Sequence, residues 1–332
     1  MSTLTETAVK ALLATATTTS LRPRHEGANI SVGIGFKHVN YLVEAAVLEH
    51  FQSHGLPIGE LFLEAGLGLE LTRLDTRLNS VVVMDDVVTA TVTPTTKEEA
   101  AEFTFTVTLE VERAGTRTKA VTSKVAAVFR AVESDQRFDR PAALDRFTVA
   151  GLGAAAAPGR PLPAALGDGT TTGRGSTGAD PVLARLLEGK NAHGWKWRIP
   201  YFYCHYNERI QTSGYLRQME EVVDLFLADR GISVRTLLAE RSWIPAVTHS
   251  RIDVLDEALM EEELYTVYTM EEIFKDLLYR SRMDCYVVRD GLLVQTATGV
   301  ITHGYAEMRD GDRAWGLVSF DDRVRRAFNN ER

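Results

Sequence analysis

One pattern of residues occurs twice in this chain, at a constant spacing of 176 positions. Gly55 follows the stretch LVEAAVLEHFQSHG, and Gly231 follows LRQMEEVVDLFLADRG at the matching place. Gly115 in the turn VERAGTRT matches Gly291 in the turn VVRDGLLV. A spacing that stays the same from Gly55 to Gly115 requires a duplicated unit without a net insertion. The sequence therefore predicts two similar halves, and we expect the chemistry where the halves face each other.

Each half is predicted to contain an opening extended stretch, one amphipathic helix and then antiparallel strands. Apolar residues at helical spacing, with a glycine just past the end, predict helices over 38–54 and 214–230. Alternating Val, Ile, Thr and Phe predict the strands that follow. These cover 66–76, 80–93, 102–113 and 117–132 in the first half and 244–255, 262–275, 277–289 and 292–306 in the second. Since the sheet is where each helix can bury its apolar face, we expect an α+β fold.

The segment between the halves, GLGAAAAPGRPLPAALGDGTTTGRGSTGAD, has almost no large apolar side chain to bury. Such a composition is typical of a flexible linker, because burial cannot offset its conformational entropy. The Thr-rich stretch near the N-terminus is also expected to be mobile. The predicted parts are an N-terminal extension (1–22), the first unit (23–135), the linker (136–194), the second unit (195–310) and a C-terminal tail (311–332).

Composition excludes several classes of protein. The formal net charge of −8 argues against a nucleic-acid surface, which needs clustered Lys and Arg. No apolar run is long enough to span a membrane. The two cysteines, Cys204 and Cys285, indicate reduced thiols and a cytoplasmic setting. We find no metal-ligand spacing and no strand–helix phosphate loop, so we expect neither a metal nor another cofactor.

The stretch HYNERIQTSGYLRQMEEVVDLFL resembles the first strand and helix of hot-dog acyl-thioester thioesterases. In acyl-ACP thioesterases this stretch reads Asp-x-Asn-x-His-x-Asn, followed by a Tyr and a helix with acidic residues. Asn207 matches the first Asn of that motif, Tyr215 matches the Tyr at the helix start, and Glu220 and Glu221 match the helix acids.

The chain also departs from that motif. His205 stands at the position of the Asp, Arg209 at the position of the His, and Gln211 at the position of the second Asn. In the first half, His38 and Asn40 frame a His-Val-Asn sequence just before the helix, which is similar to part of the motif but lacks its Asp.

The resemblance implies a tandem (double) hot-dog fold, each half an antiparallel sheet wrapped around one long helix. It is similar to 4-hydroxybenzoyl-CoA and acyl-ACP thioesterases, so the implied partners are acyl-CoA or an acyl-carrier protein. Hot-dog proteins usually pair two units, and this chain supplies both, with a homo-oligomer of double units as a further possibility. Different residues at matching positions, such as Asn29 and His205, favour one functional site over two equal ones.

The candidate catalytic residues are a histidine and an acid in each half, with one asparagine. His205 can exchange a proton near neutral pH, and Glu220 lies among apolar residues of its helix, as a general base would. Asn207 is expected to position water or the thioester carbonyl. Their matches in the first half are Glu44, at the same place as Glu220, and His38 at the helix start. The alternatives are a hydrogen-bonded core histidine, solvent-facing helix acids, and capping by His38.

The candidate substrate-binding residues lie at the helix starts and in two matching strands. Free backbone N–H groups and the helix dipole at a helix start can hold an oxyanion, which singles out Asn40, Gly214 and Tyr215. Thr72 and Thr248 are possible donors to a carbonyl, although threonine is common in strands for its propensity alone.

Three functions are therefore open. The first is hydrolysis of an acyl-CoA or acyl-carrier-protein thioester, in lipid or polyketide biosynthesis of a bacterium. The second keeps the fold but makes the protein a hydroxyacyl-thioester dehydratase or isomerase, because a histidine with a helix carboxylate serves that chemistry. The third is a protein that binds an acyl group without turning it over.

Overall fold

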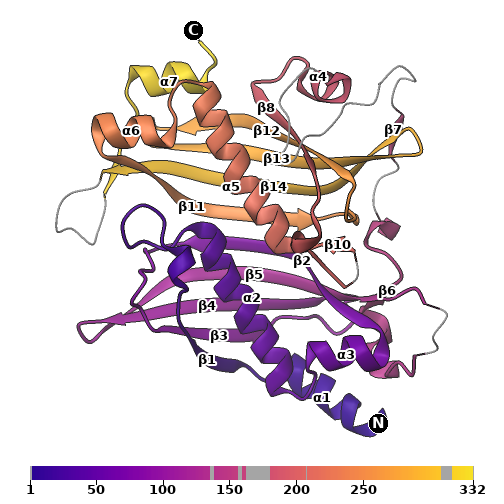
Figure 1. Ribbon diagram of the computed structural model, residues 1–332. Helices are drawn as coiled ribbons and strands as arrows, with labels where there is room; N and C mark the ends of the chain where they lie inside the picture. Colours follow the sequence, from indigo (N-terminus) through magenta and orange to yellow (C-terminus); the bar gives the residue numbers. More distant parts are fainter. Residues whose placement is uncertain are drawn as a thin grey trace. The chain divides into compact units, whose positions relative to one another are not determined.

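The computed structural model describes residues 2–134, 138–155, 159–161, 180–206, 208–307 and 316–331. The chain divides into two compact units, residues 1–155 and 156–332, called unit 1 and unit 2 below. In each unit a long helix lies across one face of an antiparallel sheet, α2 in unit 1 and α5 in unit 2 (Figure 1). The predicted α+β class is confirmed.

Unit 1 contains one five-stranded antiparallel sheet, with strands in the order β1-β3-β4-β5-β2. A short strand, β6, adds to β5 in parallel. The strands are β1 (Thr17–Leu21), β2 (Leu67–Leu78), β3 (Val88–Pro94), β4 (Phe103–Arg113), β5 (Thr116–Ala131) and β6 (Thr148–Val149). The helices are α1 (Ser2–Ala14), η1 (His25–Gly27), α2 (Phe36–Ser53), α3 (Ile58–Ala65), η2 (Ala142–Phe147) and η3 (Leu152–Ala155).

Unit 2 repeats this arrangement, with strands in the order β8-β12-β13-β14-β11 and a separate hairpin of β9 and β10. The strands are β7 (Arg160–Pro161), β8 (Ala192–Arg198), β9 (Cys204–His205), β10 (Arg209–Ile210), β11 (Trp243–Val254), β12 (Glu263–Phe274), β13 (Leu278–Arg289), β14 (Leu292–Glu307) and β15 (Leu317–Val318). The helices are α4 (Pro181–Leu187), η4 (Tyr201–Tyr203), α5 (Thr212–Asp229), α6 (Val234–Arg241) and α7 (Asp322–Phe328).

The spacing of 176 holds for element bounds as well as for residue types. It relates α2 to α5, α3 to α6, β2 to β11 and β5 to β14, each at both ends. The irregularities repeat too, because β2 has a bulge between Leu71 and Arg73 and β11 has one between Val247 and His249. A bulge at the same position in both copies shows that the pairing register was duplicated with the sequence.

Two expectations about unit 1 are wrong. The Thr-rich stretch expected to be mobile is β1, which pairs with β3 in the register Thr17 to Val92; β8 pairs with β12 in the matching register, His193 to Tyr268. β1 is thus the first strand of unit 1, formed by residues with high strand propensity. The strand expected over 80–93 begins only at Val88.

Four aromatic rings from three elements, α2, β4 and β5, pack together in the core of unit 1. Phe51 of α2 meets Phe103, Phe105 and Phe129 edge to face, at ring centroid distances of 5.2, 5.9 and 5.9 Å. All four side chains are at most 1% exposed. Edge-to-face packing is the favoured geometry of aromatic pairs, so α2 is fixed on the sheet by its C-terminal half.

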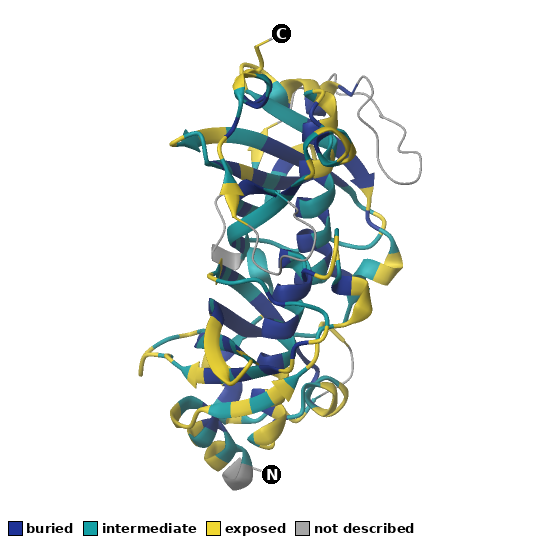
Figure 2. Cartoon of the chain, turned by 90° about the vertical axis from the view of Figure 1, so that its left-hand side faces the viewer, coloured by how far each residue is buried: buried dark blue, intermediate teal, exposed yellow. Residues whose placement is uncertain are grey.

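The interior of unit 2 lies between α5 and the same face of its sheet. Met219, Val222 and Phe226 of α5 are fully buried, and Phe226 lies 5.2 Å from the ring of Tyr268 in β12. Buried segments follow the inner side of both helices and both sheets, while exposed residues gather in the turns (Figure 2). The apolar periodicity of the sequence therefore identifies the buried face of each helix correctly.

The predicted linker, 136–194, includes ordered residues at both ends. Residues 142–155 form η2, β6 and η3, and residues 181–187 form α4. Residues 156–158 and 162–179, on which the expectation of flexibility rested, lie outside the described residues. Within the described part of the chain, no helix combines the length and the apolar character needed to cross a membrane.

Candidate functional site

The predicted catalytic segment of unit 2 is a short hairpin directly before α5. Its strands pair His205 of β9 with Arg209 of β10. The turn begins at Tyr206, whose φ of 45° is left-handed, and its ring lies 4.3 Å from that of His205. Asn207 lies outside the described residues, so its role stays a prediction. The hairpin leaves His205 partly exposed and holds it beside the start of α5.

Arg209, which stands where the resembling family has a histidine, is a buried cation. Its side chain is only 6% exposed, and its guanidinium donates to the carbonyl of Tyr206 at 3.4 Å. The guanidinium also lies 5.8 Å from the centre of the Tyr206 ring, within cation–π range. The departure from the motif therefore places a fixed positive charge opposite His205.

The first turn of α5 needs a glycine. A Cβ atom on Gly214 would lie 2.7 Å from Cγ1 of Ile210, so the helix start and β10 approach too closely for any side chain there. The N–H groups of Gly214 and Tyr215 donate to the carbonyl of Gln211, at 2.8 and 3.4 Å. Both N–H groups predicted to hold an oxyanion therefore already donate within the turn. The helix dipole, the second part of that prediction, remains available to stabilise an oxyanion.

Glu220 lies two turns into α5, on the partly exposed side of the helix. Arg217, one turn earlier, places its guanidinium 5.4 Å from the ring of Tyr203 in η4, the segment that leads into β9. The face of α5 that carries Glu220 therefore continues towards the segment that carries His205. Tyr215 faces the other way and is fully buried in the interior of unit 2.

The matching residues of unit 1 are arranged differently. His38, only 6% exposed, packs its ring against Tyr41 at 5.0 Å, and its Nε2 lies 3.8 Å from Oε1 of Glu26. Glu44 is partly exposed on α2, as Glu220 is on α5. The units differ at the helix start, where unit 1 has His38 and unit 2 has Gly214.

Asn40 belongs to a buried polar network of unit 1. Its Nδ2 donates to the carbonyl of Phe36 at 2.9 Å, and its Oδ1 accepts from Thr76 at 2.6 Å. Thr76 also contacts Ser123 Oγ at 2.7 Å, and all three polar side chains are fully buried. The geometry is that of a network that joins α2 to the sheet, and binding of substrate by Asn40 remains a prediction.

Thr72 and Thr248 are the extra residues of the two matching bulges. The hydroxyl of Thr248 donates to the carbonyl of Thr302 at 3.4 Å. The hydroxyl of Thr72 is buried and has no hydrogen-bond partner among the described residues. A bulge turns a side chain away from the regular alternation of its strand, so the sequence alone did not predict their orientation.

No family model matches the sequence, and no curated protein matches it. Solved structures do match. The 12:0-ACP thioesterase from Umbellularia californica is 8% identical with a TM-score of 0.56, and the match covers 91% of this chain and 98% of that one. An acyl-ACP thioesterase from Bacteroides thetaiotaomicron is 10% identical with a TM-score of 0.52, covering 87% of this chain and 97% of that one.

This chain is a tandem hot-dog protein. The likeness extends over nearly the whole length of both solved structures, and each unit has the helix and the five-stranded antiparallel sheet described above. The fold expected from the resemblance is confirmed. At such low identity it is the fold that is shared, so the activity must be argued from the residues of this chain.

The two hot-dog units differ in where their buried polar groups lie. Behind the start of α5, unit 2 has polar side chains at five buried positions where unit 1 has apolar ones. The pairs are Tyr215 and Val39, Gln218 and Leu42, Thr266 and Ala90, Cys285 and Leu109, and Thr296 and Ala120. Conversely, the Asn40 network of unit 1 is replaced in unit 2 by Leu216, Ile252 and Gly299. Each unit therefore has its own buried polar groups near the start of its long helix, at different positions.

A groove of about 780 Å³ lies on the sheet of unit 2, away from these residues. Its lining combines apolar residues such as Phe274 and Val300 with the cations Arg251 and Arg280. Arg251 is paired with Asp253 at 2.6 Å, and Arg280 with the nearby Glu271 and Glu272. Both of these arginines are thus paired with acids, and none of the predicted catalytic residues lines the groove.

Neither cysteine has the environment of a nucleophile. Burial, with a smaller contribution from Glu208, raises the pKa of Cys204 to about 11, and burial raises the pKa of Cys285 to about 12. A thiol needs a lowered pKa to react as thiolate near neutral pH. Among the described residues, no three His, Cys, Asp or Glu side chains are grouped so as to hold a metal ion.

Proposed function

We propose that this tandem hot-dog protein hydrolyses an acyl thioester and that unit 2 carries the reaction. The observation that carries the proposal is the placement of His205 in a hairpin directly before α5, whose partly exposed face carries Glu220. The shared fold with acyl-ACP thioesterases supports it. The acyl group would arrive on CoA or on an acyl-carrier protein.

In the proposed reaction, Glu220 or His205 removes a proton from water as the water oxygen attacks the thioester carbonyl carbon. Asn207 would position that water or the carbonyl, and the positive end of the α5 dipole would stabilise the developing oxyanion. The tetrahedral intermediate then collapses, its carbon–sulfur bond breaks, and the protonated base returns its proton to the leaving thiolate. The products are a carboxylic acid and a free thiol.

The residues of the chain favour water as the nucleophile over a covalent route through sulfur. Both cysteine thiols have a raised pKa, so neither is ionised near neutral pH. A direct attack by water needs only one general base, and His205 and Glu220 both lie on elements that meet at the start of α5.

A second candidate is dehydration or isomerisation of a hydroxyacyl thioester. The residue that favours it is His205, which stands where the resembling thioesterases have an aspartate. A histidine there would remove an α-proton while Glu220 protonates the leaving hydroxyl, and the thioester bond would stay intact. The setting we propose for either reaction is lipid or polyketide biosynthesis in a bacterium.

Thiol release from a panel of acyl-CoA and acyl-carrier-protein substrates tests the proposal. Hydrolysis predicts a free thiol. Glu220→Gln or His205→Ala, whichever removes the general base, should lower its rate by about a hundredfold, the scale of general-base catalysis. Asp224→Asn, an exposed acid on the same helix, should leave the rate unchanged. Enoyl absorbance with the thioester intact would establish the dehydratase instead. Thermal stabilisation by acyl-CoA without any product would mean that the protein only binds the acyl group.

A further inference from the structure

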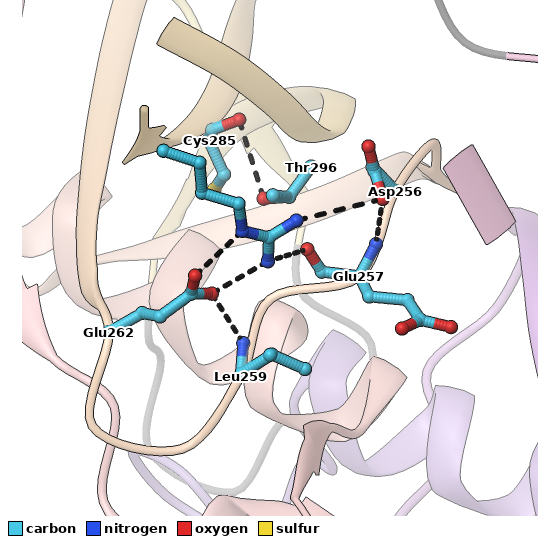
Figure 3. A network of polar contacts seen from close by, with 7 residues as sticks. Asp256, Glu257, Leu259, Glu262, Cys285 and Thr296 are labelled. Carbon is cyan, nitrogen blue, oxygen red and sulfur yellow. Dashed lines mark hydrogen bonds and ion pairs between the residues drawn. The ribbon is translucent and has the colours of Figure 1, made fainter. Parts of the chain in front are cut away.

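An arginine of β13 holds the loop that joins β11 to β12 in unit 2. Arg289 donates through Nε to Oε1 of Glu262 at 2.7 Å, and through Nη2 to Oε2 of Glu262 and to the carbonyl of Glu257 at 2.8 and 2.7 Å. Oε2 of Glu262 also accepts from the N–H of Leu259 at 2.7 Å. Figure 3 shows Glu262, Glu257 and Asp256 gathered around this guanidinium. We call Arg289 with its bonds to Glu262 and Glu257 the arginine clamp.

The clamped loop, residues 255–262, is also bonded to the hairpin of the proposed reaction. Ile210 N–H donates to the carbonyl of Ala258 at 2.9 Å, and Met260 N–H donates to the carbonyl of Glu208 at 2.7 Å. The loop therefore lies between the clamp and β10. Its backbone links the hairpin to Arg289 of the sheet, so the sheet fixes where the hairpin lies. Bidentate arginine–carboxylate bonds fix geometry more tightly than a single contact does.

The clamp also lies beside the start of α5. Burial raises the pKa of Tyr215 well above its ordinary value, Cys285 raises it further, and the neighbouring Thr296 and Arg289 act in the opposite direction. The hydroxyl of Thr296 donates to the carbonyl of Cys285 at 3.5 Å, and the carbonyl of Thr296 accepts from Leu255 N–H at 2.8 Å. Sheet and loop thus share one set of polar contacts, and the buried Tyr215 of the helix start lies near them.

Unit 1 has the same clamp, displaced by 176 residues. Arg113 donates through Nε to Asp86 at 2.9 Å and through Nη2 to the carbonyl of Val81 at 2.7 Å. The remaining bonds follow in the same order: Val83 N–H to Asp86 at 2.8 Å, Ile34 N–H to the carbonyl of Val82 at 2.8 Å, and Met84 N–H to the carbonyl of Val32 at 3.0 Å. The duplication supplies a matched control for every contact of the clamp.

We propose that Arg289 is a positioning residue for the reaction of unit 2, because through loop 255–262 it fixes the hairpin that carries His205. The role rests on the proposed function, whereas the mechanical link from clamp to hairpin stands on the bonds alone. Arg113 performs the same mechanical task for the segment before α2, and its loss should not affect a reaction carried by unit 2.

Hydrogen exchange of backbone amides tests the mechanical link without any substrate. Arg289→Met should raise exchange at Ile210 and Met260 at least tenfold and leave Ile34 unchanged. Arg113→Met should give the reverse, with faster exchange at Ile34 and no change at Ile210. Unchanged exchange at Ile210 and Met260 in Arg289→Met would overturn the proposal, as would equal changes in both units.

Steady-state kinetics of thiol release test the positioning role. Both variants are measured well below the melting temperature of the less stable one. Arg289→Met should lower kcat at least tenfold with KM changed less than threefold, whereas Arg113→Met should keep kcat within twofold. Arg289→Lys, which keeps the charge but not the two-pronged geometry, should recover only part of kcat.

A double variant separates positioning from stability. Arg289→Met with Glu262→Leu removes both members of the charge pair and should recover melting temperature without recovering kcat. Recovery of kcat together with the melting temperature would reduce the clamp to a structural role and overturn the proposal. If the native protein releases no thiol, the proposed function fails, and the exchange experiment still decides whether the clamp holds the hairpin.

Discussion

At the scale of single residues, His303 of β14 lies in a setting that disfavours a charge. Its side chain is 3% exposed and stacks on Tyr279 at a ring distance of 5.1 Å. Its Nδ1 has no hydrogen-bond partner among the described residues. Burial lowers the pKa of His303 to about 3, so the imidazole stays neutral in the folded protein under all but strongly acidic conditions.

This lowered pKa predicts a loss of stability in acid. Between pH 6.5, the ordinary histidine value, and about pH 3, the unfolded chain binds a proton at this residue and the folded chain does not. The free energy of unfolding should therefore fall by about 1.4 kcal/mol for each pH unit below 6.5 on account of His303. Urea unfolding of His303→Gln, measured from pH 7 to pH 4.5, gives its free energy of unfolding at each pH. Plotted against pH, this free energy should have a slope shallower by that amount than in the native protein. An unchanged slope would contradict the assignment.

At the same scale, the Asn40 network should be sensitive to the loss of one member. Thr76→Val removes the hydroxyl that donates to Asn40 and contacts Ser123. Asn40 Oδ1 and Ser123 Oγ, both buried, then each lose this hydrogen-bond partner. We expect a loss of about 1–3 kcal/mol in the free energy of unfolding. Asn40→Leu with Thr76→Ile, the residues of unit 2 at these positions, should cost less than Thr76→Val. The acceptor on Asn40 is removed together with its donor, so of the side chains that Thr76 contacts only Ser123 loses a partner. Denaturant unfolding of the three proteins measures both differences, and a larger loss in the double variant would be the contrary result.

At the scale of elements, the sequence was sufficient where the pattern is local. Alternation and turn glycines place β4, β5, β13 and β14 within two residues of their observed ends. Residues 80–87 belong to the strand that the sequence predicts over 80–93, yet the observed strand begins only at Val88. In the fold they form a loop held by Arg113, a residue far along the chain, so tertiary contacts override propensity.

The candidate site divides in the same way. The helix start around Gly214 and the place of Glu220 on its helix follow from local sequence. The hairpin that carries His205 does not, because the sequence predicts only an extended stretch there. The role of Arg289 does not follow, although the sequence shows it at a matching position to Arg113. Its partners Glu262 and Glu257 lie across a loop and a strand, and only the folded chain brings them together.

At the scale of the whole molecule, duplication has kept the skeleton and changed its interior. Element bounds, bulges and arginine clamps repeat at one spacing, while buried polar groups differ between the two units. Such a division is expected when one copy keeps a reaction and both copies keep the fold, because packing and function constrain different residues. This difference supports the proposal that unit 2 carries the reaction, which rests on the placement of His205 and Glu220.

The most direct test of that proposal is turnover in water labelled with ¹⁸O, with thiol and acid measured together. Hydrolysis predicts one equivalent of free thiol for each equivalent of acid and one labelled oxygen in the carboxylate. Both signals should fall sharply in Glu220→Gln or in His205→Ala, whichever variant removes the general base. An intact thioester with an enoyl product, or an acid without label, would contradict the account.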